Sequence, residues 1–164
     1  MNDLETVLAA NRAAVDDLMA TAERAEWDTP RAPGKWSAAQ VVEHVARSFE
    51  EAANAVANRP TKLPTLPRFV RPIAGWLFRG VLRTGRFPKS KTSRALNPMS
   101  SDATPSTAAE GRKRLDAALA LFEQECRARA GLPVHHISFG RISVEEYVRF
   151  AELHTRHHTG QIPS

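Results

Sequence analysis

The last part of the chain holds three histidines within five positions, where an apolar periodicity predicts a helix. His154 and His158 are one helical turn apart, so their side chains lie on the same face and could bind one metal ion together. His157 is three positions from His154 and could chelate with it in place of His158. The pattern predicts a histidine metal site on this helix and leaves the second ligand undecided between His157 and His158.

A third candidate ligand, His44, lies in an earlier predicted helix. If the two helices pack face to face, His44 meets the late histidines at one point, as in bundles that hold metals in their core. Three neutral imidazoles leave one coordination position open, which is typical of a catalytic metal site and not of a structural one. Zn, Ni, Mn and Fe can all accept three imidazoles, so the donor set does not select one metal.

The chemistry expected of such a site follows from its charge. Three neutral ligands leave the ion its full positive charge, and the pKa of a zinc-bound water can fall to about 7. A thiol in the open position would lose its proton in the same way. The sequence therefore predicts activation of either water or a thiol and does not decide between them. A third interpretation is that the metal only fastens two helices.

Four long helices are needed to position these residues, and the apolar periodicity predicts them at residues 3–25, 37–58, 105–131 and 143–161. Ser37 with Gln40 and Ser143 with Glu146 form capping-box patterns at two of the starts, and Thr104 is the expected cap of the third helix.

Seven prolines interrupt residues 60–106, so this stretch is expected to be a crossover, with one short helix at residues 72–82 lying across the bundle. The predicted fold is an all-α four-helix bundle with a long crossover between helices two and three.

Composition limits the kind of protein. The 164 residues, 42% of them hydrophobic, are expected to form one domain with one core over residues 1–164. Cys126 is the only cysteine, so no internal disulfide is possible, and on an apolar stripe it is expected to be an inert core thiol. No segment approaches the roughly 20 apolar residues that span a bilayer, and the N-terminus is acidic. A cytoplasmic protein is expected.

The positive charge is concentrated in one segment. Ten of the 23 Lys and Arg lie between Arg59 and Arg94, with no Asp or Glu among them. A solvated basic loop is the simplest interpretation, but the segment could also meet phosphate, an anionic membrane surface or an acidic small molecule. Nucleic acid is not expected, because the segment lacks the signatures of the common RNA modules. Arg79, Arg83 and Arg86 are candidates to bind the carboxylate of a substrate or thiol. The competing function is a non-catalytic binding module that uses this segment.

Other polar residues near the motifs are expected to have ordinary roles. His135 and His136 are predicted to be loop residues around a turn at Gly140, although either could line a pocket. Glu43 and Glu152 adjoin the candidate ligands in sequence, but helical neighbours point about 100° apart. Either carboxylate could support a metal ligand or face solvent, and we expect both to face solvent.

The sequence resembles the DinB/YfiT-like superfamily of metal-dependent enzymes. The residues that carry this resemblance lie at the starts of two helices and at the C-terminal end: Gly34-Lys35-Trp36-Ser37, Gln40 and His44, Phe139-Gly140, Ser143-Val-Glu-Glu-Tyr147 and His154-x-x-x-His158-x-x-Gln161-Ile162. The resemblance covers both motif helices, and the spacing of the last motif is its most specific part.

The resemblance implies a four-helix bundle, often dimeric, with a divalent metal held by His44, His154 and His158, which favours His158 over His157. Zinc or nickel is the metal expected in such a family. Its characterised relatives include thiol-dependent S-transferases and a maleylpyruvate isomerase that uses a low-molecular-weight thiol. The implied function is therefore that of a metal-dependent thiol transferase or hydrolase acting on a small-molecule substrate, with a homodimer as the expected assembly.

Overall fold

The computed structural model describes residues 3–89, 91–100 and 104–162. The described elements are five α-helices, one 3-10 turn and a two-stranded hairpin: α1 (Leu4–Arg24), α2 (Ala38–Val56), α3 (Arg71–Thr84), η1 (Pro98–Ser100), α4 (Ala108–Ala128), β1 (Val134–His136), β2 (Gly140–Ile142) and α5 (Val144–Thr159). The predicted all-α bundle with a long crossover is confirmed.

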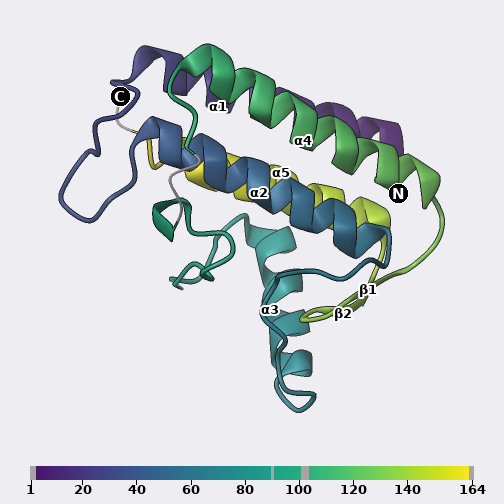
Figure 1. Ribbon diagram of the computed structural model, residues 1–164. Coiled ribbons are helices and arrows are strands. Elements are labelled where there is room, and N and C mark those ends of the chain that lie inside the picture. Colours follow the sequence, from purple (N-terminus) through teal and green to yellow (C-terminus); the bar gives the residue numbers. More distant parts are fainter. Residues whose placement is uncertain (1–2, 90, 101–103, 163–164) are drawn as a thin grey trace.

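The bundle consists of α1, α2, α4 and α5, which lie alongside one another in two layers (Figure 1). In the main contacts α2 packs on α4 and α1 packs on α5. The core between them is formed by fully buried apolar side chains, the largest of which on these helices are Leu8, Leu18, Met19, Leu115, Leu119 and Phe122. Burying these side chains is the main force that holds the helices together and so fixes how α2 faces α5.

Both predicted capping boxes are present. The Ser37 side chain accepts a hydrogen bond from the Gln40 amide at 3.3 Å, and the Gln40 side chain accepts one from the Ser37 amide at 3.0 Å. The Ser143 and Glu146 pair does the same at 3.0 and 2.8 Å. These caps satisfy amides that have no partner within the helix and fix the first residue of α2 and α5.

The predicted start of the third long helix is wrong by three residues. The cap is Thr107, whose side chain accepts from the Glu110 amide at 3.2 Å, and not Thr104. The reason is a tertiary contact: the Trp27 indole N–H donates to the Pro105 carbonyl at 2.9 Å. This bond holds the chain at Pro105 against the loop that follows α1, so α4 begins only after it.

The hairpin before α5 was missed. Strands β1 and β2 pair antiparallel, with Val134 opposite Ile142 and His136 opposite Gly140. The turn is closed by His136, whose Nδ1 accepts the backbone N–H groups of Ser138 at 3.1 Å and of the following residue at 3.2 Å. Three-residue strands give no periodicity to detect, so the sequence showed only a turn.

The crossover contains α3, which runs across the bundle on one side of it (Figure 1). The predicted helix at residues 72–82 is confirmed and is slightly longer, ending at Thr84 before the cap Gly85, whose φ is +67°. Phe78 is buried and its ring centroid lies 4.7 Å from that of Phe139 and 5.0 Å from that of Phe150. These contacts hold α3 against the hairpin and α5.

Gly111 lets α4 approach the Trp27 ring. A Cβ at this position would lie 2.8 Å from the Trp27 Cζ2 atom and 3.4 Å from a methyl of Val42. We expect Gly111→Ala to lower the free energy of unfolding by about 1–3 kcal/mol, because overpacking outweighs the helix propensity of alanine. Urea unfolding measures the change.

Gly80 provides the matched control. It lies inside α3, where an added Cβ would meet no atom within 4 Å. Gly80→Ala is expected to leave stability unchanged or to raise it by up to about 1 kcal/mol. Equal stabilisation by both substitutions would show that Trp27 does not restrict α4.

Candidate metal centre

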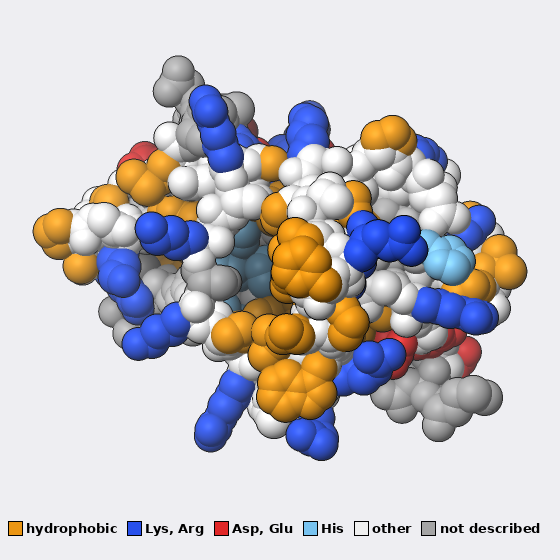
Figure 2. All heavy atoms as spheres, turned by 90° about the horizontal axis from the view of Figure 1, so that it is seen from below, with side chains coloured by type: hydrophobic (Ala, Val, Ile, Leu, Met, Phe, Trp, Pro, Cys, Tyr) orange, Lys and Arg blue, Asp and Glu red, His pale blue; other side chains and the backbone are white. Residues whose placement is uncertain are grey.

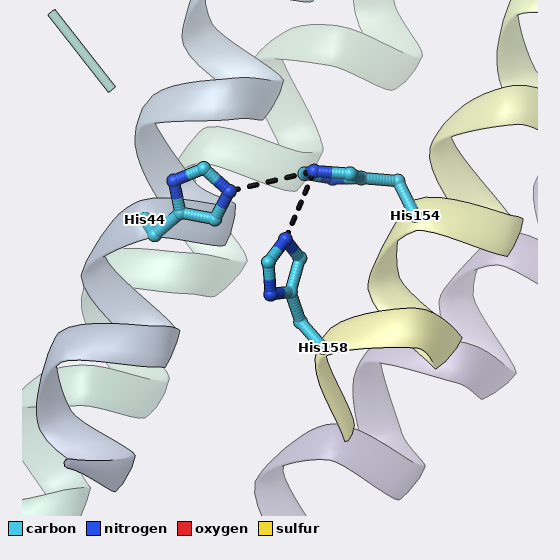
Figure 3. A group of neighbouring side chains, drawn as sticks. All are labelled: His44, His154 and His158. Atoms are coloured by element: carbon cyan, nitrogen blue, oxygen red, sulfur yellow. Dashed lines mark hydrogen bonds between the residues drawn. The ribbon is translucent and has the colours of Figure 1, made fainter. Parts of the chain in front are cut away.

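Three histidine side chains from α2 and α5 converge between these helices (Figure 3). The Nε2 atom of His154 lies 3.4 Å from the Nε2 of His44 and 3.1 Å from the Nε2 of His158. All three ligand atoms lie within 4.8 Å of one another. The structure thus brings the early histidine to the late pair, as the sequence predicted.

These distances fit one metal ion. In a tetrahedral site with metal–nitrogen bonds of about 2.0–2.1 Å, neighbouring ligand nitrogens are about 3.3–3.4 Å apart. The two measured separations, 3.4 and 3.1 Å, are close to that edge length. The His44 and His158 nitrogens lie within 4.8 Å of each other, so these two rings must move closer together to bind an ion, and three ligands leave a fourth position open.

Hydrogen bonds on the far side of two rings set their tautomers. The Nδ1 of His44 lies 2.8 Å from the Leu96 carbonyl oxygen, and the Nδ1 of His158 lies 2.8 Å from the side-chain oxygen of Gln161. Because these oxygens can only accept, each Nδ1 carries the proton. The lone pair of each Nε2 is then directed at the centre of the cluster, as in histidines that bind metals.

His157 lies outside the cluster. Its side chain is exposed, and its Nε2 lies 3.0 Å from the amide nitrogen of Gln161. Gln161 therefore bridges the two neighbouring histidines, donating to His157 and accepting from His158. Of the two alternatives that helical spacing left open, only His158 joins His154 at the point where His44 arrives.

Burial keeps the three imidazoles neutral. It lowers the pKa of His44 to about 4 and, with the nearby His44 as a smaller cause, that of His158 to about 3. Burial also places the pKa of His154 well below its ordinary value, and the other histidines lower it further. Neutral imidazole is the form that binds a metal ion, so at pH 7 binding needs no net loss of protons from the three rings.

Aromatic rings border the cluster. The ring centroid of Trp36 lies 4.8 Å from that of His44 and 5.9 Å from that of His158. Phe87, which follows α3 in the crossover, lies 5.7 Å from His154. Seen from the α3 side, histidine side chains are visible at the bottom of a hollow in the surface (Figure 2). Trp36 and Phe87 thus give the cluster largely apolar neighbours.

The expectation that Glu43 and Glu152 face solvent is wrong. Glu43 is 2% exposed and pairs with Arg47 at 2.7 Å and with Arg114 of α4 at 3.3 Å. Glu152 is 3% exposed and pairs with Arg156 at 3.0 Å. In a bundle, a side chain that does not face the ligands can be covered by neighbouring residues, so it need not face water. Their arginine partners make them structural ion pairs.

The candidate arginines of the crossover are exposed. Arg79 and Arg83 lie on α3, and Arg86 follows it, one residue before the Phe87 ring that borders the cluster. Arg79 donates to the Gly75 carbonyl of its own helix at 3.4 Å. The structure therefore brings the end of the basic segment to the rim of the site, and substrate binding by these side chains stays a prediction.

Three other predicted residues, His135, His136 and Cys126, lie outside the histidine cluster. His136 is buried, and burial lowers its pKa to about 4, while His135 is exposed; both border a cleft of about 450 Å³ beside Arg141. Cys126 is fully buried, and burial raises the pKa of its thiol to about 12. This thiol stays protonated at neutral pH, which agrees with an inert core cysteine.

Comparison with known proteins agrees with this geometry. A sequence model described as the DinB superfamily matches residues 7–162, a range that includes both histidine-bearing helices. No curated protein and no solved structure matches the chain significantly.

Proposed function

This chain belongs to the DinB superfamily, and we propose that it is a metal-dependent enzyme in which His44, His154 and His158 hold one divalent ion. The observation that carries the proposal is the convergence of three Nε2 atoms, two of which have their ring protons held on the opposite nitrogen. Zinc or nickel is the proposed metal, because both accept a site made of neutral imidazoles.

The proposed reaction uses the open position. A divalent ion there supplies positive charge that lowers the pKa of a thiol or water, to about 7 for zinc-bound water. The role of the chain is to hold three neutral imidazoles in place and to surround the reacting atoms with Trp36 and Phe87. Such walls favour a small substrate with an apolar part and limit the access of bulk water.

The proposed activity is transfer of a low-molecular-weight thiol to an electrophilic carbon, or hydrolysis if water takes the same position. In the transfer, the sulfur forms a carbon–sulfur bond, the leaving group departs with its electron pair and the thiol proton passes to solvent. Arg79, Arg83 and Arg86 are proposed to attract a carboxylate on the thiol or substrate, since guanidinium groups bind carboxylates well.

An activity assay on zinc-loaded and nickel-loaded protein tests the proposal. We expect conjugation of cysteine-derived thiols to 1-chloro-2,4-dinitrobenzene, or hydrolysis of an aryl ester, to fall at least about 100-fold in His154→Ala. The matched control is His135→Ala, which removes an exposed histidine outside the cluster and should keep full activity. Rates in the metal-loaded protein no higher than those of His154→Ala, for both reactions, would overturn the proposed function.

A further inference from the structure

The outward side of α3 carries a row of exposed hydrophobic side chains. Phe69, Ile73, Trp76 and Leu77 are 81%, 59%, 70% and 41% exposed. The last three lie along one side of α3, and Phe69 lies in the turn just before it. We call these four residues the α3 outer face. The opposite side of α3 is buried on the protein, with Phe78 as its largest anchor. Packing in this chain therefore does not explain the outer face.

Positive side chains surround this face. It lies inside residues 59–94, which hold ten Lys and Arg and no Asp or Glu. Arg79 and Arg83 are exposed and, at 100° per residue, border the row on one side of the helix, while Arg68 precedes Phe69. Figure 2 shows hydrophobic side chains gathered in the middle of this surface with Lys and Arg around them.

We propose that the α3 outer face docks the protein on anionic membranes. A helix with exposed Trp, Phe and Ile on one side and arginines beside them has the composition of helices that lie in the interface of a bilayer. The hydrophobic row would enter the boundary between headgroups and acyl chains, where Trp is favoured. The arginines would remain at the level of the lipid phosphates. Among the described residues no helix is long and apolar enough to cross a membrane, so binding is at the surface.

Charge favours a membrane over a second copy of the chain. In a twofold dimer through the α3 outer face, each basic segment would lie against its own copy, and like charges would repel. An anionic bilayer supplies the opposite charge over the whole basic surface. Because this attraction is electrostatic, binding is expected to depend on both lipid charge and ionic strength.

Vesicle sedimentation with the full chain tests this proposal. We expect binding to vesicles of 70% phosphatidylcholine and 30% phosphatidylglycerol, at least about tenfold weaker binding to pure phosphatidylcholine, and release by salt. The double variant Ile73→Ser and Trp76→Ser should lose at least about tenfold in binding. Arg68→Gln with Arg83→Gln should reduce both binding and its salt dependence. On binding, the fluorescence of the wild type should shift to the blue, and Trp76→Phe should bind without most of that shift.

The control variant is Leu121→Ser with Leu132→Ser, which removes exposed leucines outside α3 and should bind like the wild type. Thermal unfolding followed by circular dichroism shows whether the variants fold. Metal content, which does not depend on lipid, tests the proposed function separately, so failure of docking and failure of the proposed function are distinguishable. Equal binding to both vesicle types, or full binding by the Ile73 and Trp76 variant, would overturn the proposal. If the wild type is a dimer and the Ile73 and Trp76 variant is a monomer, the α3 outer face binds a second copy, and membrane docking is overturned. If the protein binds an immobilised acidic protein but not anionic vesicles, the face binds a protein partner, and membrane docking is likewise overturned.

Discussion

Replacing any one of His44, His154 and His158 with alanine is expected to weaken metal binding by more than about 100-fold. Each supplies one of three ligands, so its loss costs more than the 10–100-fold that is typical when only a supporting hydrogen bond is removed. Elemental analysis after dialysis should give about one ion per chain for the wild type and little for the variants. A competitive titration with a chelator then measures the affinities.

Two further substitutions make this series specific. His157→Ala, next to a ligand but outside the cluster, should retain the ion. Gln161→Leu removes the acceptor of the His158 Nδ1–H bond and should weaken binding by about 10–100-fold without abolishing it. Unchanged metal content in all three alanine variants would reject the site.

Acid is expected to unfold the metal-free protein between pH 6.5 and about 4. Burial lowers the pKa of His44 and His136 to about 4, that of His158 to about 3 and that of His154 further below its ordinary value. The unfolded chain binds a proton on each histidine below about pH 6.5, while the native state keeps them neutral. The unfolded state thus holds more protons, and stability, fully present above pH 6.5, falls as the pH falls.

The size of this effect is large for a small protein. A shift from 6.5 to about 4, as for His44 and His136, corresponds to about 3 kcal/mol at each site. Urea titrations at pH 7.5 and at pH 5 measure the part of this loss that is reached by pH 5, about 2 kcal/mol at each of these sites. Saturating zinc should move the loss to lower pH, because protons and metal compete for the same lone pairs.

A substitution at His136 distinguishes the effect of histidine burial on stability from the effect of metal binding. His136 lies outside the cluster, so His136→Asn should reduce the pH dependence by about one proton while metal content stays unchanged. Stability that does not change from pH 7.5 to 5 in the metal-free protein would show that these histidines are not held neutral by the fold.

The parts of the fold that depend on local pattern could be predicted from the sequence. The four bundle helices and the crossover helix follow from apolar spacing, and the starts of α2 and α5 from the capping boxes at Ser37 and Ser143. The start of α4 could not be predicted in this way. It depends on the bond between Trp27 and the Pro105 carbonyl, which joins residues far apart in the sequence.

In the candidate site, too, local spacing could be predicted from the sequence and long-range contacts could not. Helical spacing paired His154 with a late histidine and the family resemblance favoured His158, but spacing alone could not show that His158 meets His44, because this depends on how α5 packs against α2. The Leu96 carbonyl that orients His44 has no sequence signal, because any residue carries a carbonyl group. Phe87 was missed for a related reason: its place at the rim depends on the path of the crossover after α3.

X-ray absorption at the metal edge of the zinc-loaded protein tests the central claim most directly, because it reports the ligands of the ion itself. We expect three imidazole nitrogens at about 2.0–2.1 Å, one further light ligand, and the loss of one imidazole in His44→Ala. An ion with no imidazole ligands, or one with the same number of imidazole ligands in His44→Ala as in the wild type, would contradict the proposed three-histidine site.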